Sequence, residues 1–305
     1  MTGRSAIGAG VVAPGRLGLG ASGLAGAARR YGEAVTPSQL TVLVTGATSG
    51  IGEEVARQFA SAGHRVFGTS RHPDKVADPI PGVTYVRLDN ADYESATECA
   101  REVGDVDILI NNAGESQAGA LEDTPIGAVE DLFRINVFGP IALTKAVLPG
   151  MRERRRGTVV MVGSMLSSFP VAFRSNYAAT KSALKTYAFA TRREVAPYGI
   201  RMISVEPGTI ATGIGDRRSI YIGENSPYRD EYETLAAATR HNEEEGISGA
   251  EMAAVIVDAA LAEHPKPFYA KGNSAGLVFS LRRLLPRQFI LDMTARKHGL
   301  RRVKI

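Results

Sequence analysis

The feature that most constrains the fold of this chain is an alternation, from Leu40 onward, of short β-branched runs with longer segments of helical periodicity. Strands that alternate with helical segments form βαβ units, and their parallel strands pair in a sheet that helices bury on both faces. The seven strand-like runs are residues 41–45, 65–69, 84–88, 106–110, 158–163, 200–206 and 268–270. The pattern predicts an α/β protein with one doubly wound, parallel, seven-stranded sheet.

The expected helices between these runs include residues 52–62, about 128–152, 175–197 and 249–263. Residues 39–272 thus form the predicted catalytic domain. Within it, residues 209–247 have no clear period and are too long for a plain connection, which predicts a substrate loop.

Two terminal segments lie outside this pattern. Residues 1–38 are rich in Gly and Ala with scattered Arg, which favours a flexible extension, although an acid-poor, Arg-bearing start also fits an organelle-targeting segment. Residues 273–305 mix apolar and basic side chains. That composition suits a helix that caps the substrate cleft or packs on a second subunit, and it also suits peripheral contact with a membrane.

Charge and cysteine content exclude several classes of function. The net charge is +4, but residues 275–305 hold eight basic side chains and one acidic one, which leaves 4 − 7 = −3 for the rest. A mildly acidic body argues against nucleic-acid binding. Cys99 is the only cysteine and no Cys/His cluster is present, so we expect no disulfide, no metal and a reducing, cytoplasmic setting. No apolar run reaches the length of a transmembrane helix.

A glycine-rich turn, TGATSGIG at residues 45–52, directly follows the first strand and precedes a helical pattern. Glycines allow a tight turn and close approach to a pyrophosphate, and the positive end of the following helix favours an anion. The turn therefore predicts a dinucleotide phosphate site. The G-x3-G-x-G spacing differs from both the G-x-G-x-x-G fingerprint and a phosphate-binding loop with Gly-Lys-Ser/Thr.

The end of the second strand bears on which dinucleotide binds. Enzymes that use NAD usually carry Asp or Glu there for the ribose hydroxyls, whereas a basic residue accommodates the 2′-phosphate of NADP. Ser70 stands at the expected acidic position and Arg71 follows it. This favours NADP(H) over NAD(H); the alternative is that Arg71 is a solvated surface charge.

Tyr177 and Lys181 lie four residues apart near the start of a predicted helix, so their side chains share one face. Ser164 ends the preceding strand, where the carboxyl edge of an open α/β sheet forms its ligand crevice. Alone, each of these residues has an ordinary structural explanation. Together they predict a site for acid–base chemistry.

With the sequence Asn111-Asn112-Ala113-Gly114 after the fourth strand, these motifs make the chain resemble the compact, single-domain branch of the short-chain dehydrogenase/reductase family. The resemblance spans about residues 40–272, and it includes Asp89, Asn136 and residues 207–212. It departs from the family at Asn90, where the family often has an apolar residue, and in the N-terminal extension.

The resemblance implies a Rossmann-type fold and an oxidoreductase that interconverts a ketone or aldehyde and an alcohol with a nicotinamide cofactor, which the end of the second strand favours as NADP(H). It implies that Tyr177 exchanges the proton, Ser164 binds the substrate oxygen, Lys181 binds the nicotinamide ribose, and Asn136 positions a proton-relaying water. A tyrosine ordinarily has a pKa near 10, so it needs a nearby cation to exchange protons readily. The expected cofactor-binding residues are Gly46, Thr48, Ser49, Gly50, Ile51, Gly52, Ser70, Arg71, Asp89, Asn90, Asn112, Ala113, Gly114, Tyr177, Lys181, Pro207, Gly208, Ile210 and Thr212.

Apolar residues near the catalytic motifs favour an apolar small-molecule substrate, such as a steroid-like, lipid or polyketide-like carbonyl; the alternative is that they are ordinary core. They are Met165, Leu166, Phe169, Phe173, Ile210, Ile214, Ile220, Tyr221, Ile222, Tyr228 and Tyr232. The resemblance also implies a homodimer or homotetramer.

Two other functions compete with this one. An NADP(H)-binding sensor or scaffold without turnover is disfavoured by the intact catalytic residues. A nucleotide-sugar epimerase or dehydratase is disfavoured because the glycine spacing differs and the C-terminal segment is short.

Overall fold

The structure is a computed structural model that describes residues 39–211, 213 and 215–301. The expectations for residues 1–38, for Thr212 and for Ile214 lie outside the described residues.

Seven parallel strands form the central sheet, in the order β3-β2-β1-β4-β6-β7-β11. This confirms the predicted doubly wound sheet, with strand ends within two residues of the expected positions. The strands are β1 (Thr41–Val44), β2 (Arg65–Ser70), β3 (Val83–Arg87), β4 (Ile108–Asn111), β6 (Gly157–Val162), β7 (Ile200–Pro207) and β11 (Phe268–Lys271).

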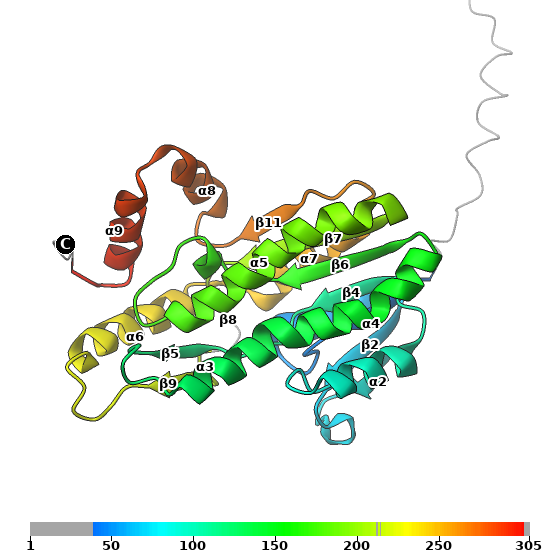
Figure 1. Ribbon diagram of the computed structural model, residues 1–305, viewed down its shortest axis with the longest axis horizontal. Coiled ribbons are helices and arrows are strands. Elements are labelled where there is room, and N and C mark those ends of the chain that lie inside the picture. Colours follow the sequence, from blue (N-terminus) through cyan, green and yellow to red (C-terminus); the bar gives the residue numbers. More distant parts are fainter. Residues whose placement is uncertain (1–38, 212, 214, 302–305) are drawn as a thin grey trace, which may run out of the picture. The chain divides into compact units, whose positions relative to one another are not determined.

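Helices cover both faces of the sheet (Figure 1). Helices α1 and α7 pack together on one face, and α2, α4 and α5 cover the other. The helices are α1 (Gly50–Ser61), α2 (Tyr93–Val103), α3 (Ile126–Phe133), α4 (Gly139–Glu153), α5 (Ser175–Val195), α6 (Arg229–Glu244), α7 (Gly249–Leu261), α8 (Ala275–Leu284) and α9 (Arg287–Lys297). Two small parallel pairs add β5 (Gln117–Gly119) with β9 (Ser219–Tyr221) and β8 (Ile210–Ala211) with β10 (Ile247–Ser248).

The central strands β1, β4 and β6 are largely apolar and buried because each of their two faces meets a helical layer. In β1, Val42 and Val44 belong to the core beneath α1 and α7, whereas Leu43 belongs to the core on the opposite face. This alternation follows from the two-residue period of a strand. Both layers therefore fix the register of the sheet.

The structure corrects two expectations about regular elements. The segment 209–247 is not a plain loop, because it contains β8, β9 and α6. Helix α6 buries only Tyr232 and Leu235, which explains why its sequence has no clear apolar period. The expected helix at about 128–152 begins at Ile126, and a π-helical turn, Arg134–Phe138, separates α3 from α4.

Among the described residues, one continuous helical segment, Ile126–Glu153, is long and apolar enough to cross a membrane by length and composition alone. Core helices of soluble proteins can have the same length and apolar composition. Helix α4 within this segment packs against α2 and contributes Leu143 and Met151 to the core.

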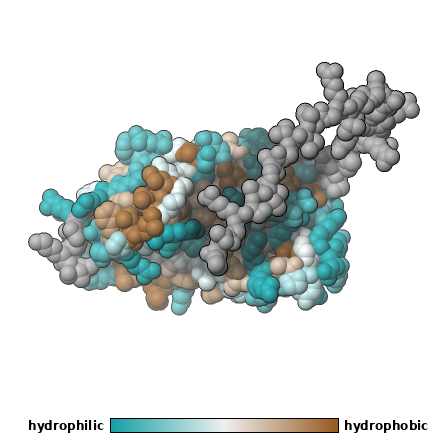
Figure 2. Space-filling model, turned by 90° about the horizontal axis from the view of Figure 1, so that it is seen from above, coloured by the Kyte–Doolittle hydropathy of each residue, from teal (hydrophilic) through white to brown (hydrophobic). Residues whose placement is uncertain are grey.

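Helices α8 and α9 lie side by side beyond β11 (Figure 1). Leu277, Leu284 and Phe289 on these helices are exposed. Figure 2 shows a hydrophobic patch, surrounded by hydrophilic surface, at the end of the molecule where α8 and α9 lie. A second subunit and a membrane surface remain predictions for what meets this patch.

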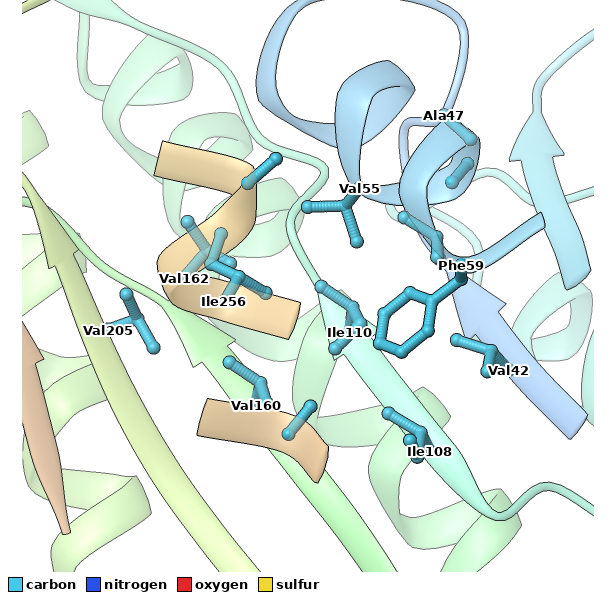
Figure 3. Close-up of a cluster of buried hydrophobic side chains, with 14 of the residues drawn as sticks. Val42, Ala47, Val55, Phe59, Ile108, Ile110, Val160, Val162, Val205 and Ile256 are labelled. Atoms are coloured by element: carbon cyan, nitrogen blue, oxygen red, sulfur yellow. The ribbon is translucent and has the colours of Figure 1, made fainter. Parts of the chain in front are cut away.

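Phe59 anchors α1 to the sheet, and its ring points toward Val42, Ile108 and Ile110 (Figure 3). The side chain is fully buried. We expect Phe59→Ala to lower the free energy of unfolding by about 3–5 kcal/mol, because it removes buried apolar area and leaves a cavity. Urea denaturation followed by circular dichroism measures this change.

Phe289→Ala is the matched control for this prediction, since 52% of that side chain is exposed. Its effect should stay within about 0.5 kcal/mol. Equal losses for the two variants would contradict the placement of Phe59 in the core.

Candidate active site

A cavity of about 290 Å³ opens at the carboxyl ends of the central strands. Residues that follow three neighbouring strands line it, among them Gly114 after β4, Ser164 after β6 and Gly208 after β7. The carboxyl edge of an open α/β sheet is where such folds bind ligands. The cavity therefore lies where the order of the strands predicts a site.

Ser164 is held in the cavity wall by its own backbone and hydroxyl. It precedes a short 3₁₀ turn, Met165–Ser167, and its Oγ accepts a hydrogen bond of 3.2 Å from the Leu166 N–H. Because the oxygen accepts this bond, the hydroxyl proton stays available for donation. Ser164 can thus donate to an oxygen atom in the cavity.

Tyr177 and Lys181 occupy successive turns of α5 and both line the same cavity as Ser164. The Lys181 ammonium lies 5.8 Å from the centre of the Tyr177 ring and donates to the Val162 carbonyl at 3.1 Å. Both side chains are buried. The structure therefore joins a phenol, an ammonium and a hydroxyl in one cavity, as the resemblance implies.

Asn136 is fully buried in the π-helical turn between α3 and α4. Its amide exchanges two hydrogen bonds with the backbone of Glu115, with distances of 2.8 and 2.9 Å, and donates to the Thr180 Oγ1 at 3.3 Å. A π-helical turn within a longer helix often marks a functional position. Here it aims Asn136 at the loop after β4, beside Lys181.

The side chains of Asn136 and Lys181 both lie next to Gly114. A Cβ atom built on Gly114 would lie 2.9 Å from the Asn136 Oδ1 and 3.4 Å from the Lys181 Nζ. The loop after β4 therefore runs directly over these two polar groups.

The glycine-rich turn has the shape that a bound pyrophosphate requires. Gly46 and Gly50 have φ angles of 66° and 59°, which favour glycine. A Cβ atom on Gly52 would lie 2.3 Å from the Gly46 carbonyl oxygen. The Ser49 side chain does not cap α1, so the first-turn N–H groups of the helix are left for an anion. The cradle fits a dinucleotide phosphate.

Thr45 and Asn112 fix this turn to the loop after β4. The Thr45 Oγ1 accepts hydrogen bonds from the backbone N–H groups of Asn112 and Ala113, each 2.9 Å long. The Asn112 amide donates to the Thr45 carbonyl at 3.0 Å. The two loops that are expected to hold the cofactor are thereby locked together.

The end of β2 lies beside this turn, because the Gly46 N–H donates to the Thr69 hydroxyl at 3.2 Å. At the end of β2, the Ser70 Oγ accepts from the His72 N–H, and Arg71 is exposed. No hydrogen bond or ion pair of Arg71 occurs in the part of the chain that the structure describes. The Arg71 guanidinium is thus available to a ligand.

Two expected residues after β3 have structural contacts of their own. The Asp89 carboxylate accepts from the Ala91 N–H at 2.9 Å, and the Asn90 amide donates to the Ile135 carbonyl at 3.3 Å. Asn90 is buried, and Gly139 passes so close that a Cβ there would lie 2.4 Å from the Asn90 carbonyl oxygen. The hydrogen bond to Ile135 gives the buried amide a partner at a position where the family often has an apolar residue.

Several of the expected cofactor-binding residues line the cavity, and others do not. Those that line it are Ile51, Asn112, Gly114, Tyr177, Lys181, Pro207, Gly208 and Ile210. Those outside its wall are Gly46, Thr48, Ser49, Gly50, Gly52, Ser70, Arg71, Asp89, Asn90 and Ala113. The second group follows β1, β2, β3 and β4, toward the other half of the same sheet edge.

The expected apolar substrate wall is present in part. Met165, Leu166, Phe169 and Ile210 line the cavity. The remaining described members of the expected set lie elsewhere; the rings of Phe173 and Tyr232, for example, contact each other edge-on at 5.9 Å. Helices α8 and α9 complete the wall with Val278, Met293, Thr294, Lys297 and His298. The C-terminal segment thus caps the cleft, one of the roles that its composition suggests.

Partial burial at the end of α9 lowers the pKa of two basic groups in this wall. Desolvation holds the pKa of His298 below its ordinary value, and the charges of Lys297 and Arg174 lower it further, against a backbone hydrogen bond to Thr294. Desolvation also lowers the pKa of Lys297. His298 and Lys297 thus lie at the cavity wall, with His298 partly buried and Lys297 exposed.

A polar cluster in the cavity wall was not anticipated from the sequence. Arg174 and Arg218 both donate to the Ser116 Oγ, at 3.0 and 3.2 Å, and Arg218 also forms an ion pair with Glu243. Burial is the largest cause that lowers the pKa of Arg174 to about 10, followed by the charge of Arg218. Arg174 stays charged at neutral pH. Its place three residues before Tyr177 was the only sequence signal for it.

The chain matches the short chain dehydrogenase family over residues 40–220. Dehydrogenase/reductase SDR family member 7B of Xenopus laevis is 34% identical over 272 residues, which cover 84% of this chain and 81% of the relative. The 3-ketodihydrosphingosine reductase of Bacteroides thetaiotaomicron is 33% identical over 233 residues, which cover 75% of this chain and 86% of the relative.

A solved short-chain dehydrogenase from Streptomyces avermitilis superposes with a TM-score of 0.70 and 36% identity, over 82% of this chain and 95% of the other. The fold, the order of the motifs and these similarities agree. The chain belongs to the short-chain dehydrogenase/reductase family of oxidoreductases, which bind a nicotinamide cofactor.

Proposed function

We propose that this protein uses NADP(H) to interconvert a largely apolar ketone or aldehyde and the corresponding alcohol. The observation that carries the proposal is the meeting of Ser164, Tyr177 and Lys181 in one buried cavity, with the ammonium 5.8 Å from the phenol ring. A protein that only sensed the cofactor would not need this set.

Side chains of the protein bind the substrate oxygen and transfer its proton. When bound, the nicotinamide supplies or accepts a hydride at the carbonyl carbon. In the reductive direction, Tyr177 gives its phenolic proton to the carbonyl oxygen, and Ser164 donates a hydrogen bond to the same oxygen as negative charge develops. The nearby Lys181 ammonium favours the phenolate that remains. In the oxidative direction the proton returns to Tyr177.

The expected roles of Lys181 and Asn136 fit their surroundings. The Lys181 ammonium lies at the carboxyl end of β6, where it can also bind the nicotinamide ribose. Asn136 holds the Glu115 backbone beside Lys181. A water placed there by the Asn136 turn would pass protons from Lys181 toward solvent.

The preference for NADP(H) rests on the end of β2. Ser70 stands where NAD enzymes usually carry a carboxylate, and the exposed Arg71 guanidinium is free of protein partners within the described residues. A guanidinium can form two parallel hydrogen bonds with the 2′-phosphate of NADP. NAD lacks this phosphate and gains nothing from Arg71.

The apolar substrate class rests on Met165, Phe169 and Val278, which line the cavity and pack in one apolar cluster. One relative is named for a substrate with a ketone on a sphingosine skeleton. Both observations favour a carbonyl compound with a hydrocarbon body.

We expect Tyr177→Phe to lower kcat for ketone reduction by at least about 100-fold, because general acid catalysis contributes roughly 100- to 10,000-fold. The variant keeps the ring and removes only the hydroxyl. Stopped-flow or steady-state absorbance of NADPH measures turnover. Tyr187→Phe is the matched control, since Tyr187 lies on the same helix and is 47% exposed. Near-wild-type turnover of Tyr177→Phe would refute the mechanism.

We expect Arg71→Ala to raise the KM for NADPH about ten-fold or more while the KM for NADH changes little, because a charge-assisted hydrogen bond contributes roughly 1.5–3 kcal/mol. Initial rates with each cofactor test this. Arg65→Ala serves as the control, because Arg65 lies at the opposite end of the same strand. Parallel changes for NADPH and NADH would assign Arg71 to the surface instead.

We expect kcat/KM to rise several-fold per added methylene across a series of linear 2-ketones until the cavity is filled, since each buried methylene contributes about 0.8 kcal/mol. Initial rates of NADPH oxidation across the series provide the measurement. Preference for short polyhydroxylated carbonyls would overturn the proposed substrate class.

A further inference from the structure

Arg174 is a buried cation in the substrate cavity, and no carboxylate among the described residues forms an ion pair with it. Its side chain is 6% exposed, and its guanidinium lies 4.7 Å from the centre of the Tyr177 ring. Its one hydrogen bond among the described residues goes to the uncharged Ser116 hydroxyl. The Arg174 Nε is buried without any partner. Most of the donors of this guanidinium are therefore unused by the protein.

A second guanidinium increases the excess of positive charge. Arg218 donates to the same Ser116 oxygen and forms an ion pair with Glu243, whose charge acts on Arg174 only from beyond ion-pair distance. The ionised side chains in the cavity wall are Arg174, Lys181, Arg218 and Lys297 against Glu115 and Glu243, which gives 4 − 2 = +2. The cavity thus carries two more positive than negative charges.

A buried, unpaired charge destabilises a fold unless a partner meets it. The missing partner of Arg174 would be an anion, and a planar guanidinium matches the paired oxygen atoms of a carboxylate or a phosphate. We propose that the substrate carries such an anionic oxygen group, which Arg174 binds beside the reacting carbonyl. This inference rests on the proposed carbonyl chemistry and narrows its substrate class.

The geometry separates this group from the cofactor phosphates. The phosphate cradle is the turn at residues 45–52 after β1, whereas Arg174 lies against the ring of Tyr177, the residue that meets the carbonyl. The anionic group therefore lies within a few bonds of the reacting carbon. The hydrocarbon part of the substrate extends along Met165, Phe169 and Val278, which line the same cavity.

Pairs of ketones that differ only in charge test the inference. One pair is a long-chain γ-keto acid and its methyl ester; a second is a hydroxyketone and its phosphate monoester. The measured quantity is the ratio of kcat/KM for the charged and the neutral member of each pair. We expect at least one ratio to exceed about ten in the wild type, the size expected for a charge-assisted hydrogen bond. The pair with the larger ratio distinguishes carboxylate from phosphate.

Arg174→Gln should bring that ratio close to one, and Arg174→Lys should give an intermediate value, because lysine keeps the charge but loses the planar pair of donors. Arg193→Gln is the matched control. Arg193 lies on the same helix, is exposed and is absent from the cavity wall, so this variant should keep the wild-type ratio.

Calorimetric titration of the wild-type protein, saturated with NADP+, gives a second readout that needs no turnover. The charged ketone should bind about ten-fold more tightly than its neutral partner. Equal ratios and equal affinities for both pairs would overturn the anion site while leaving the proposed function intact. A rise only in the KM for NADPH in Arg174→Gln would also overturn it, by assigning Arg174 to the cofactor. Absence of NADPH oxidation with every ketone would instead contradict the proposed function.

Discussion

The active site depends on the parallel direction of the central strands. Because β1, β4, β6 and β7 all run the same way, the residues that follow them meet at one edge of the sheet. Helix α5 lies across this arrangement, and Lys181 reaches the Val162 carbonyl at the end of β6. The two apolar layers that hold the strands in register therefore also set the relation between the glycine-rich turn and the side chains of Ser164, Tyr177 and Lys181.

Buried positive charges determine the electrostatic environment of this sheet edge. Lys181 and Arg174 are only 5% and 6% exposed, and both lie against the ring of Tyr177. Water screens such charges poorly, so their effect on a nearby phenol or ligand is stronger than at the surface. The backbone carbonyl that receives Lys181 stabilises the ammonium in place. Arg174 donates only to a hydroxyl, and this difference agrees with the proposed roles of Lys181 in the chemistry and of Arg174 in binding an anionic group.

The sequence predicted those features that depend on local pattern. Strand runs, the glycine-rich turn, and the spacing of Tyr177 and Lys181 each occupy a few neighbouring residues, so the sheet and the shared cavity could be anticipated. Arg174 could not, because its environment is set by Ser116 and by Arg218 on a distant segment. Helix α6 could not be predicted from apolar periodicity, because it buries few apolar side chains. The C-terminal cap was one of several roles that composition allowed, and only tertiary packing distinguished it.

The π-helical turn at Arg134–Phe138 limits how the chain can change in length. An ordinary helix advances about 100° per residue, since 3.6 residues complete a turn. A π-helical turn holds one residue more, so loss of one residue here would restore α-helical bonding and leave α4 in place. Leu143 and Met151 would stay in the core, but the turn that brings Asn136 to Glu115 would be lost. Proteins that keep this site should therefore keep the extra residue of this turn.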